Sequence, residues 1–245
     1  MNKITMNSHR KQLWAVLCSA LVAARALGGG DVTVESNHIT LFGKKFFRGN
    51  SPTVTLGAYG EKKSPLLGQN YLEVQNTMPA PKINAAPVNK ATIVEIDFSK
   101  SSKTEVEAFV KGILPVNASG QVTYDKLKTA ELKLVYLVIH AGDLERQVNA
   151  SPGVLGDLRD YGNDARVCHE ILVAMSATTA NTFAKSASLT VTKAGSGLTI
   201  STSGEKSTSV TLSSGTTFAY LLVKADWGKG KDSISKFTDD QWSVN

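Results

Sequence analysis

The side chains that could do chemistry in this chain are few and far apart. Its four histidines, His9, His38, His140 and His169, are distant from one another in sequence, and none belongs to an HExxH motif or a Cys/His array. Cys168 and His169 are adjacent, but neighbouring residues on a strand face opposite sides of a sheet. We therefore expect a packed pair here rather than a zinc site.

A second group of candidate ligands is acidic. Asp157, Asp160 and Asp164 lie close together in sequence, and clustered carboxylates are what hard cations such as calcium prefer. Their spacing matches no known calcium loop, and Arg159 offers simple ion pairing instead. We expect these residues to form the solvated end of a helix, with no bound metal.

The patterns of nucleophilic and phosphate-binding sites are missing from the sequence. The chain contains no G-x-S-x-G elbow, the motif that exposes a catalytic serine. Gly28-Gly29-Gly30 follows an apolar segment, whereas the glycines of a phosphate-binding loop precede their helix. We therefore predict no catalytic residues, no cofactor and a non-enzymatic role.

The two cysteines, Cys18 and Cys168, do not provide a disulfide framework. Free cysteine packs like a small hydrophobic residue, so both are expected to be buried thiols rather than bridged or reactive ones.

Composition and charge describe a folded protein without an evident polyanionic partner. The 245 residues are 42% hydrophobic and 20% charged, too apolar for general disorder. The net charge of +6 is concentrated at the N-terminus, where residues 1–30 carry four of the 27 basic residues and no acid. Lys44–Arg48 mixes basic and aromatic side chains, but five such residues are more typical of an exposed strand edge. No specific nucleic acid is predicted.

The N-terminus has two interpretations. A cationic start, an apolar stretch over 13–24 and the small residues of Ala24-Arg25-Ala26 fit a secretory signal peptide. The same segment fits an amphipathic helix that begins at Ser8 and ends at Gly28. If residues 1–26 are cleaved, we expect a periplasmic or secreted protein. If they are retained, we expect a cytoplasmic protein that moves to a membrane, with Cys18 as a possible lipid-facing or acylated residue.

Apolar runs predict the buried elements of one β-rich domain over 31–227, followed by a polar tail over 228–245. Leu132–Ile139 is expected to be a core strand. Ser151-Pro152 is a typical helix start, and Gly162 a plausible stop. A strand is expected from about 167 to 183, and an extended connection over Met78–Pro81. A short helix fits residues 99–113, and a strand fits the alternating residues 105–110 nearly as well. Tyr220, Leu222 and Trp227 are expected to be core residues.

The strongest pattern lies in residues 187–213, here called the ribbon, and continues to Val223. Apolar residues alternate with serine and threonine, and Gly/Ser turns interrupt the alternation. This pattern predicts antiparallel strands with one wet face. The apolar positions, which we propose as the membrane-inserting or subunit-pairing element, are Leu189, Val191, Leu198, Ile200, Val210 and Leu212.

The order of these elements resembles that of gasdermin pore-forming proteins. The apolar strand, turn, Gly-Thr and apolar strand from Val210 to Tyr220 are similar to the end of the gasdermin pore-forming domain. Bacterial gasdermins also have about this length and an N-terminal cysteine, to which Cys18 corresponds loosely. The resemblance covers the last quarter of the chain. It implies oligomeric pores that form after release of a short C-terminal tail, here the end that contains Gly228–Lys231.

Together these patterns predict a β-dominated α+β fold, a twisted and mostly antiparallel sheet with an N-terminal helix and one or two short helices. The expected role is non-enzymatic self-assembly into a homo-oligomer, with a bacterial gasdermin-like pore in membrane lipid as its most specific form. A structural protein of a virion, tail or surface layer and a secreted binding module are the alternatives.

Overall fold

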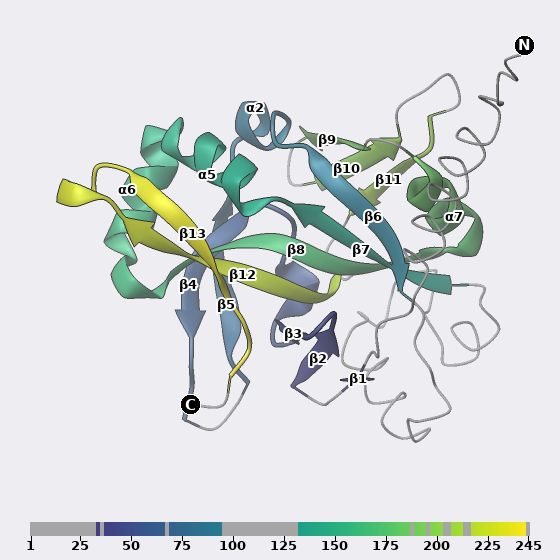
Figure 1. Cartoon of the computed structure of the whole chain (residues 1–245), viewed down its shortest axis with the longest axis horizontal. Coiled ribbons are helices and arrows are strands. Elements are labelled where there is room, and N and C mark those ends of the chain that lie inside the picture. Colours follow the sequence, from purple (N-terminus) through teal and green to yellow (C-terminus); the bar gives the residue numbers. More distant parts are fainter. Residues whose placement is uncertain are drawn as a thin grey trace, which may run out of the picture. The chain divides into compact units, whose positions relative to one another are not determined.

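Strands make up most of the structure, a computed structural model that describes residues 33–34, 37–66, 69–94, 132–186, 189–194, 197–202, 207–212 and 217–243. The described residues all belong to one compact unit within 31–245. The described strands belong to one large, mostly antiparallel sheet (Figure 1). The predicted β-dominated α+β class is confirmed. The predicted N-terminal helix, Cys18 and residues 99–113 lie outside the described residues.

The sheet has a continuous path of ten strands and three strands beside that path. In spatial order the path is β1 (Thr33–Val34), β2 (His38–Leu41), β3 (Lys44–Phe47), β12 (Thr217–Trp227), β8 (Ala165–Ser176), β7 (Leu132–Ile139), β6 (Val88–Val94), β9 (Leu189–Ala194), β10 (Gly197–Thr202) and β11 (Ser209–Leu212). β13 (Ile234–Asp240) pairs with β12, and β4 (Ala58–Lys63) pairs with β8 and with β5 (Tyr71–Thr77).

The long strands β8 and β12 lie at the centre of the sheet and carry much of the core. Ten of the 12 residues of β8 and eight of the 11 residues of β12 are buried, as expected for strands that are largely apolar on both faces. The predicted core strand Leu132–Ile139 is present as β7. Tyr220 and Leu222 are fully buried, and Trp227 packs partly buried against the same core.

Helices cover parts of this sheet. They are α2 (Ala80–Ile83), α5 (Ala141–Asn149), α6 (Pro152–Asp160) and α7 (Ala177–Lys185), with short 3-10 turns at Ser51–Thr53, Gly162–Asp164 and Lys229–Lys231. α6 begins with proline directly after Ser151, as predicted, and buries Val154, Leu155 and Leu158. The extended connection expected over Met78–Pro81 is partly wrong, because α2 begins at Ala80.

The strand expected over 167–183 ends earlier than predicted. β8 ends at Ser176, and the residues that follow form α7. Ser176 caps this helix, since its hydroxyl oxygen accepts a hydrogen bond from the Thr179 amide. Ala180 and Phe183 provide the buried face. The expectation of a continuous strand was therefore wrong beyond Ser176.

The polar tail expected over 228–245 contains a strand of the sheet. β13 pairs antiparallel with β12 from Leu222 to Trp227. Ile234 and Phe237 of this strand and the following Trp242 are buried. The few apolar residues of this polar segment therefore anchor it in the core.

Candidate functional site

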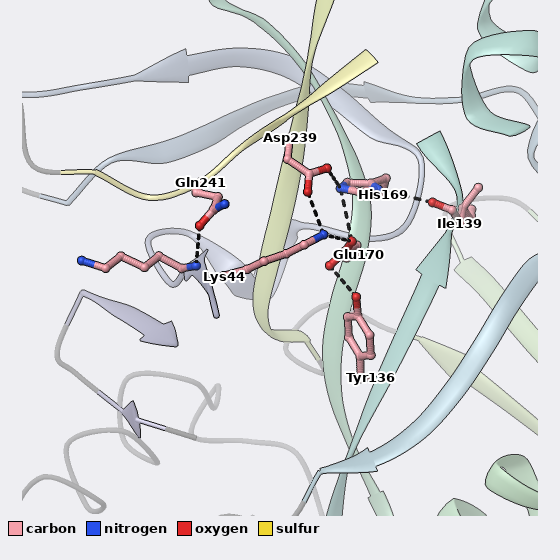
Figure 2. A network of polar contacts seen from close by, with 8 residues as sticks. Lys44, Tyr136, Ile139, His169, Glu170, Asp239 and Gln241 are labelled. Atoms are coloured by element: carbon pink, nitrogen blue, oxygen red, sulfur yellow. Dashed lines mark hydrogen bonds and ion pairs between the residues drawn. The ribbon is translucent and has the colours of Figure 1, made fainter. Parts of the chain in front are cut away.

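Five polar side chains from strands β3, β7, β8 and β13 lie close together. We call these five residues the polar cluster. They are Lys44 of β3, Tyr136 of β7, His169 and Glu170 of β8, and Asp239 of β13 (Figure 2). His169 and Glu170 are almost completely buried, at 2% and 3% exposure. Because burial of charged groups is costly unless they are paired, their contacts decide what this site can do.

A β-bulge explains why two consecutive residues reach the same site. On β12, Leu221 pairs with Glu170 and Leu222 pairs with Cys168. His169 is therefore the extra residue on β8, which breaks the alternation of side chains between the two faces of the sheet. Its Nε2 atom lies 3.7 Å from Glu170 Oε1. A bulge of this kind is not visible in the sequence.

The buried Glu170 carboxylate contacts two donors. Lys44 Nζ donates to Oε1 at 3.0 Å, and the Tyr136 hydroxyl donates to Oε2 at 2.6 Å. Burial, followed by the negative charge of Glu170, raises the pKa of Tyr136 well above its usual range. Tyr136 therefore stays protonated and remains a donor to Glu170.

Asp239 joins the cluster from the C-terminal strand. Its Oδ2 lies 2.7 Å from Lys44 Nζ, and its Oδ1 lies 3.4 Å from His169 Nε2. The pKa of Asp239 is held well below its usual range. Contact with His169 is the largest cause and contact with Lys44 a smaller one, whereas burial acts in the opposite direction. Burial alone would lower the pKa of Lys44, but its bonds to Asp239 and Glu170 raise it. Lys44 thus joins two carboxylates from strands far apart in sequence.

His169 has one nitrogen in contact with the backbone and one that faces the carboxylates. Nδ1 lies 3.3 Å from the carbonyl oxygen of Ile139. Nε2 is buried and makes no hydrogen bond within the described part of the chain. Its nearest charged neighbours are the carboxylate oxygens of Asp239 and Glu170.

The residues after Asp239 are also attached to the rest of the sheet. Asp240 accepts bonds from Lys62 at 3.1 Å and from Arg166. The Trp242 amide donates to the Lys45 carbonyl at 2.9 Å. The Trp242 ring stacks on His38, with centroids 4.3 Å apart. Residues 239–243, the C-terminal segment, are thereby tied to β2, β3, β4 and β8.

The ribbon has the geometry predicted for it, but its apolar face is buried. Leu198 pairs with Leu212, and Ile200 pairs with both Val191 and Val210. The pairs of Thr199 with Thr192 and Thr211 lie on the opposite face. Five of the six predicted apolar positions belong to the core, and Val210 packs partly buried against it: Leu189, Val191, Leu198, Ile200 and Leu212 are 0–5% exposed.

The other predicted candidates are not brought together. Asp157 accepts a hydrogen bond from the Tyr59 hydroxyl at 2.7 Å, and His140 precedes α5 as its N-cap residue. Among the described residues, the one group of three or more side chains with metal-ligand geometry is His169, Glu170 and Asp239. Cys168 is buried in the core, and burial, with a smaller contribution from Glu170, raises the pKa of its thiol. His9 lies outside the described residues.

Sequence reasoning missed Lys44, Tyr136, Glu170 and Asp239. One signal was present, because His169-Glu170 interrupts a strand that is otherwise largely apolar, and buried polar residues require partners. The partners themselves come from strands far away in sequence, and Lys44 is 126 positions from Glu170.

Comparison with protein-family models, with curated proteins and with solved structures found no match to this chain. Among the described helices, none has the length and hydrophobicity needed to span a membrane.

Proposed function

We propose that this protein is a self-assembling β-sheet protein whose copies associate through the edge strand β11. The observation that carries this proposal is an edge strand that, within the described part of the chain, carries neither charge nor proline nor a bulge. β11 ends the path of the sheet and, among the described strands, pairs only with β10. Its residues are Ser209, Val210, Thr211 and Leu212, with no charge and no proline. An edge of this kind is a template for pairing with another strand.

The other edges of the sheet carry features that oppose such pairing. β1 has only two residues. β5 carries Glu73, and its pairing with β4 contains a register shift. β13 carries Lys236, Asp239 and Asp240, and its pairing with β12 is also shifted. Short strands, charges and bulges are the devices that natural sheets use against edge-to-edge association, and β11 has only its shortness.

The ribbon next to this edge is regular, which favours addition of a further strand. β9, β10 and β11 pair without a register shift. Val and Thr on β11 favour an extended conformation. A strand from a second copy would continue the same pattern of one apolar and one Ser/Thr face.

The test is the oligomeric state of a variant in which the edge carries charge. Ser209→Lys/Thr211→Lys changes two exposed side chains of β11. Thr190→Lys/Thr192→Lys is the matched control, because these exposed threonines lie on β9, between β6 and β10. Light scattering across a concentration series should show multimers for the wild type and the control, and monomers for the β11 variant. Equal association of both variants would contradict a role for this edge.

A second candidate function, a gasdermin-like membrane pore, is favoured by the two-faced ribbon. Strands that cross a membrane as a barrel alternate apolar residues toward lipid with polar residues toward the lumen. The apolar positions of the ribbon would have to leave the core to meet lipid, since they are buried. β9 and β10 have six residues each, whereas a membrane-crossing strand needs about 9–11. Insertion therefore requires the ribbon both to detach and to lengthen.

A reversible cross-link tests this second candidate. Val88 of β6 and Leu189 of β9 are direct partners, and such pairs in antiparallel sheets lie within the range of a disulfide. In Val88→Cys/Leu189→Cys, oxidation should stop dye release from anionic liposomes, and reduction should restore it. Release that persists in the oxidised protein would rule out detachment of the ribbon from β6. A protein that stays monomeric and releases no dye would favour the secreted binding module instead.

A further inference from the structure

We propose that His169, Glu170 and Asp239 form a binding site for a divalent transition-metal ion, for which Zn²⁺ has the most suitable chemistry. One ligand atom from each of the three residues lies within 4.8 Å of the others. The site is distinct from the ribbon and does not depend on self-assembly.

The orientation of His169 is that of a metal ligand. Metal-binding histidines commonly donate their second ring N–H to a backbone carbonyl or a carboxylate, which fixes the tautomer and the plane of the ring. Nδ1 of His169 lies 3.3 Å from the Ile139 carbonyl oxygen. A proton on Nδ1 leaves the lone pair on Nε2, the nitrogen that faces Asp239 and Glu170 (Figure 2).

The buried Nε2 atom of His169 faces two carboxylates, and either a proton or a metal ion must lie between them. Nε2 lies 3.4 Å from Asp239 Oδ1 and 3.7 Å from Glu170 Oε1, and it makes no hydrogen bond within the described residues. A lone pair that faces two carboxylate oxygens in a partly buried site is unfavourable. A proton or a metal ion in this position removes the repulsion, and the metal ion interacts with all three groups at once.

The ligand set selects the type of metal. One imidazole nitrogen and two carboxylate oxygens suit zinc better than calcium or magnesium, which prefer oxygen ligands alone. Three protein ligands leave a fourth position for water in a tetrahedral site. Tyr136 donates to the other oxygen of Glu170 at 2.6 Å and would orient that carboxylate, as outer hydrogen bonds do in metal sites.

Lys44 is the residue that competes with the ion. Its ammonium lies 3.0 Å from Glu170 and 2.7 Å from Asp239, so it already forms an ion pair with each of these two ligands. The Lys44 side chain is 33% exposed, and it can therefore rotate toward solvent when an ion enters. In this arrangement the bound metal replaces the ammonium and links β8 directly to β13.

The experiment is calorimetric titration of the full chain with ZnCl₂, accompanied by thermal unfolding with and without zinc. The wild type should bind one zinc per chain and unfold at a higher temperature in its presence. Lys44→Met should bind about tenfold more tightly, because removal of one competing charge has an effect of this order. Lys45→Met is the matched control, since the Lys45 side chain faces Trp242 instead of the ligands, and it should bind as the wild type does.

Two ligand variants decide whether the ion is in this site. Asp239→Asn and His169→Gln each remove one of the three ligands and should weaken zinc binding about 100-fold or more, since loss of an outer partner of a ligand alone costs about 10–100-fold. Asp239 is one-third exposed, so Asp239→Asn should fold, and circular dichroism can verify this. Absence of saturable binding in both the wild type and Lys44→Met would overturn the proposal. Unchanged binding in folded Asp239→Asn would also overturn it, because the ion would then lie elsewhere.

Discussion

The buried carboxylate of Glu170 needs hydrogen-bond donors more than any other group of the polar cluster does. A carboxylate removed from water is stable only when donors surround it. Glu170 contacts the ammonium of Lys44 and the hydroxyl of Tyr136. These donors come from β3 and β7. The negative charge of Glu170 on β8 is therefore stable only when both of these strands are in place.

Asp239 should make stability depend on pH in the acidic range. Its pKa is lowered in the folded protein from an ordinary value of 3.8 by contact with His169 and Lys44. A lowered folded-state pKa contributes stability that is fully present above the unfolded value and is lost as pH falls toward the folded value. The excess stability of the wild type over Asp239→Asn should therefore be constant near neutral pH and shrink below about pH 4. Urea unfolding at a series of pH values measures this difference.

A suitable control for this measurement is Asp226→Asn, which changes another acidic residue of the sheet, one that is exposed on β12. This variant should follow the wild type through the acidic range. If the difference between the wild type and Asp239→Asn did not change with pH, the interaction of Asp239 with His169 and Lys44 would not contribute to stability.

At the scale of elements, one residue, Ser176, is both the last residue of β8 and the N-cap of α7. The Ser176 hydroxyl accepts from the Thr179 amide at 3.3 Å, and α7 follows β8 without a loop. Ser176→Ala should destabilise the protein by about 1 kcal/mol, the usual cost of losing an N-cap. Ser176→Asp keeps an acceptor in this position and should restore most of the stability. Chemical denaturation compares the variants, and equal stability of Ser176→Ala and the wild type would show that the cap is unimportant.

The elements that the sequence predicted correctly have unbroken patterns. Leu132–Ile139 is apolar except for Lys133 and became β7, and the alternating residues of the ribbon became β9, β10 and β11. The Ala/Thr-rich residues after Ser176 have no comparable pattern, and packing of Phe183 decides for the helix.

Bulges account for the two larger differences from prediction. On β8 the extra residue is His169, and it brings His169 and Glu170 to one site. On β13, Asp226 pairs with Lys236 and Trp227 with Ile234, so Ser235 is the extra residue. This allows both Ile234 and Phe237 to reach the core although their spacing does not fit a regular strand. Strict periodicity could predict neither the polar cluster nor β13.

At the scale of the whole molecule, the C-terminal strand connects parts of the sheet that are distant in sequence. β13 extends the edge of β12 that β3 also pairs with. Asn149 of α5 bonds both backbone groups of Ile234, at 2.8 and 2.9 Å. Asp239 and Asp240 add ion pairs to β3, β4 and β8. β13 is therefore held by a helix on one side and by charged groups of three strands.

Truncation after Trp227 should consequently unfold the protein instead of activating it. The deletion removes Ile234, Phe237 and Trp242, which are 2%, 4% and 8% exposed. Burial of a large apolar side chain contributes about 1.5–3 kcal/mol, so their combined loss is comparable with the total stability of a typical domain, about 5–15 kcal/mol. It also removes both aspartates that pair with buried or partly buried cations. The truncated chain should therefore lack a cooperative thermal transition in circular dichroism.

A shorter truncation, after Asp240, separates the role of the strand from that of the last residues. It keeps β13 and both aspartates but removes Trp242, which stacks on His38 and receives the cation of Lys45 over its ring. This protein should still unfold cooperatively, with a lower midpoint, because only one of the three buried anchors is lost. A chain truncated after Trp227 that stayed folded would instead indicate that β13 is detachable. In that case, release of the C-terminal strand would become a credible trigger for assembly, and the edge of β12 would become a second surface for pairing between copies.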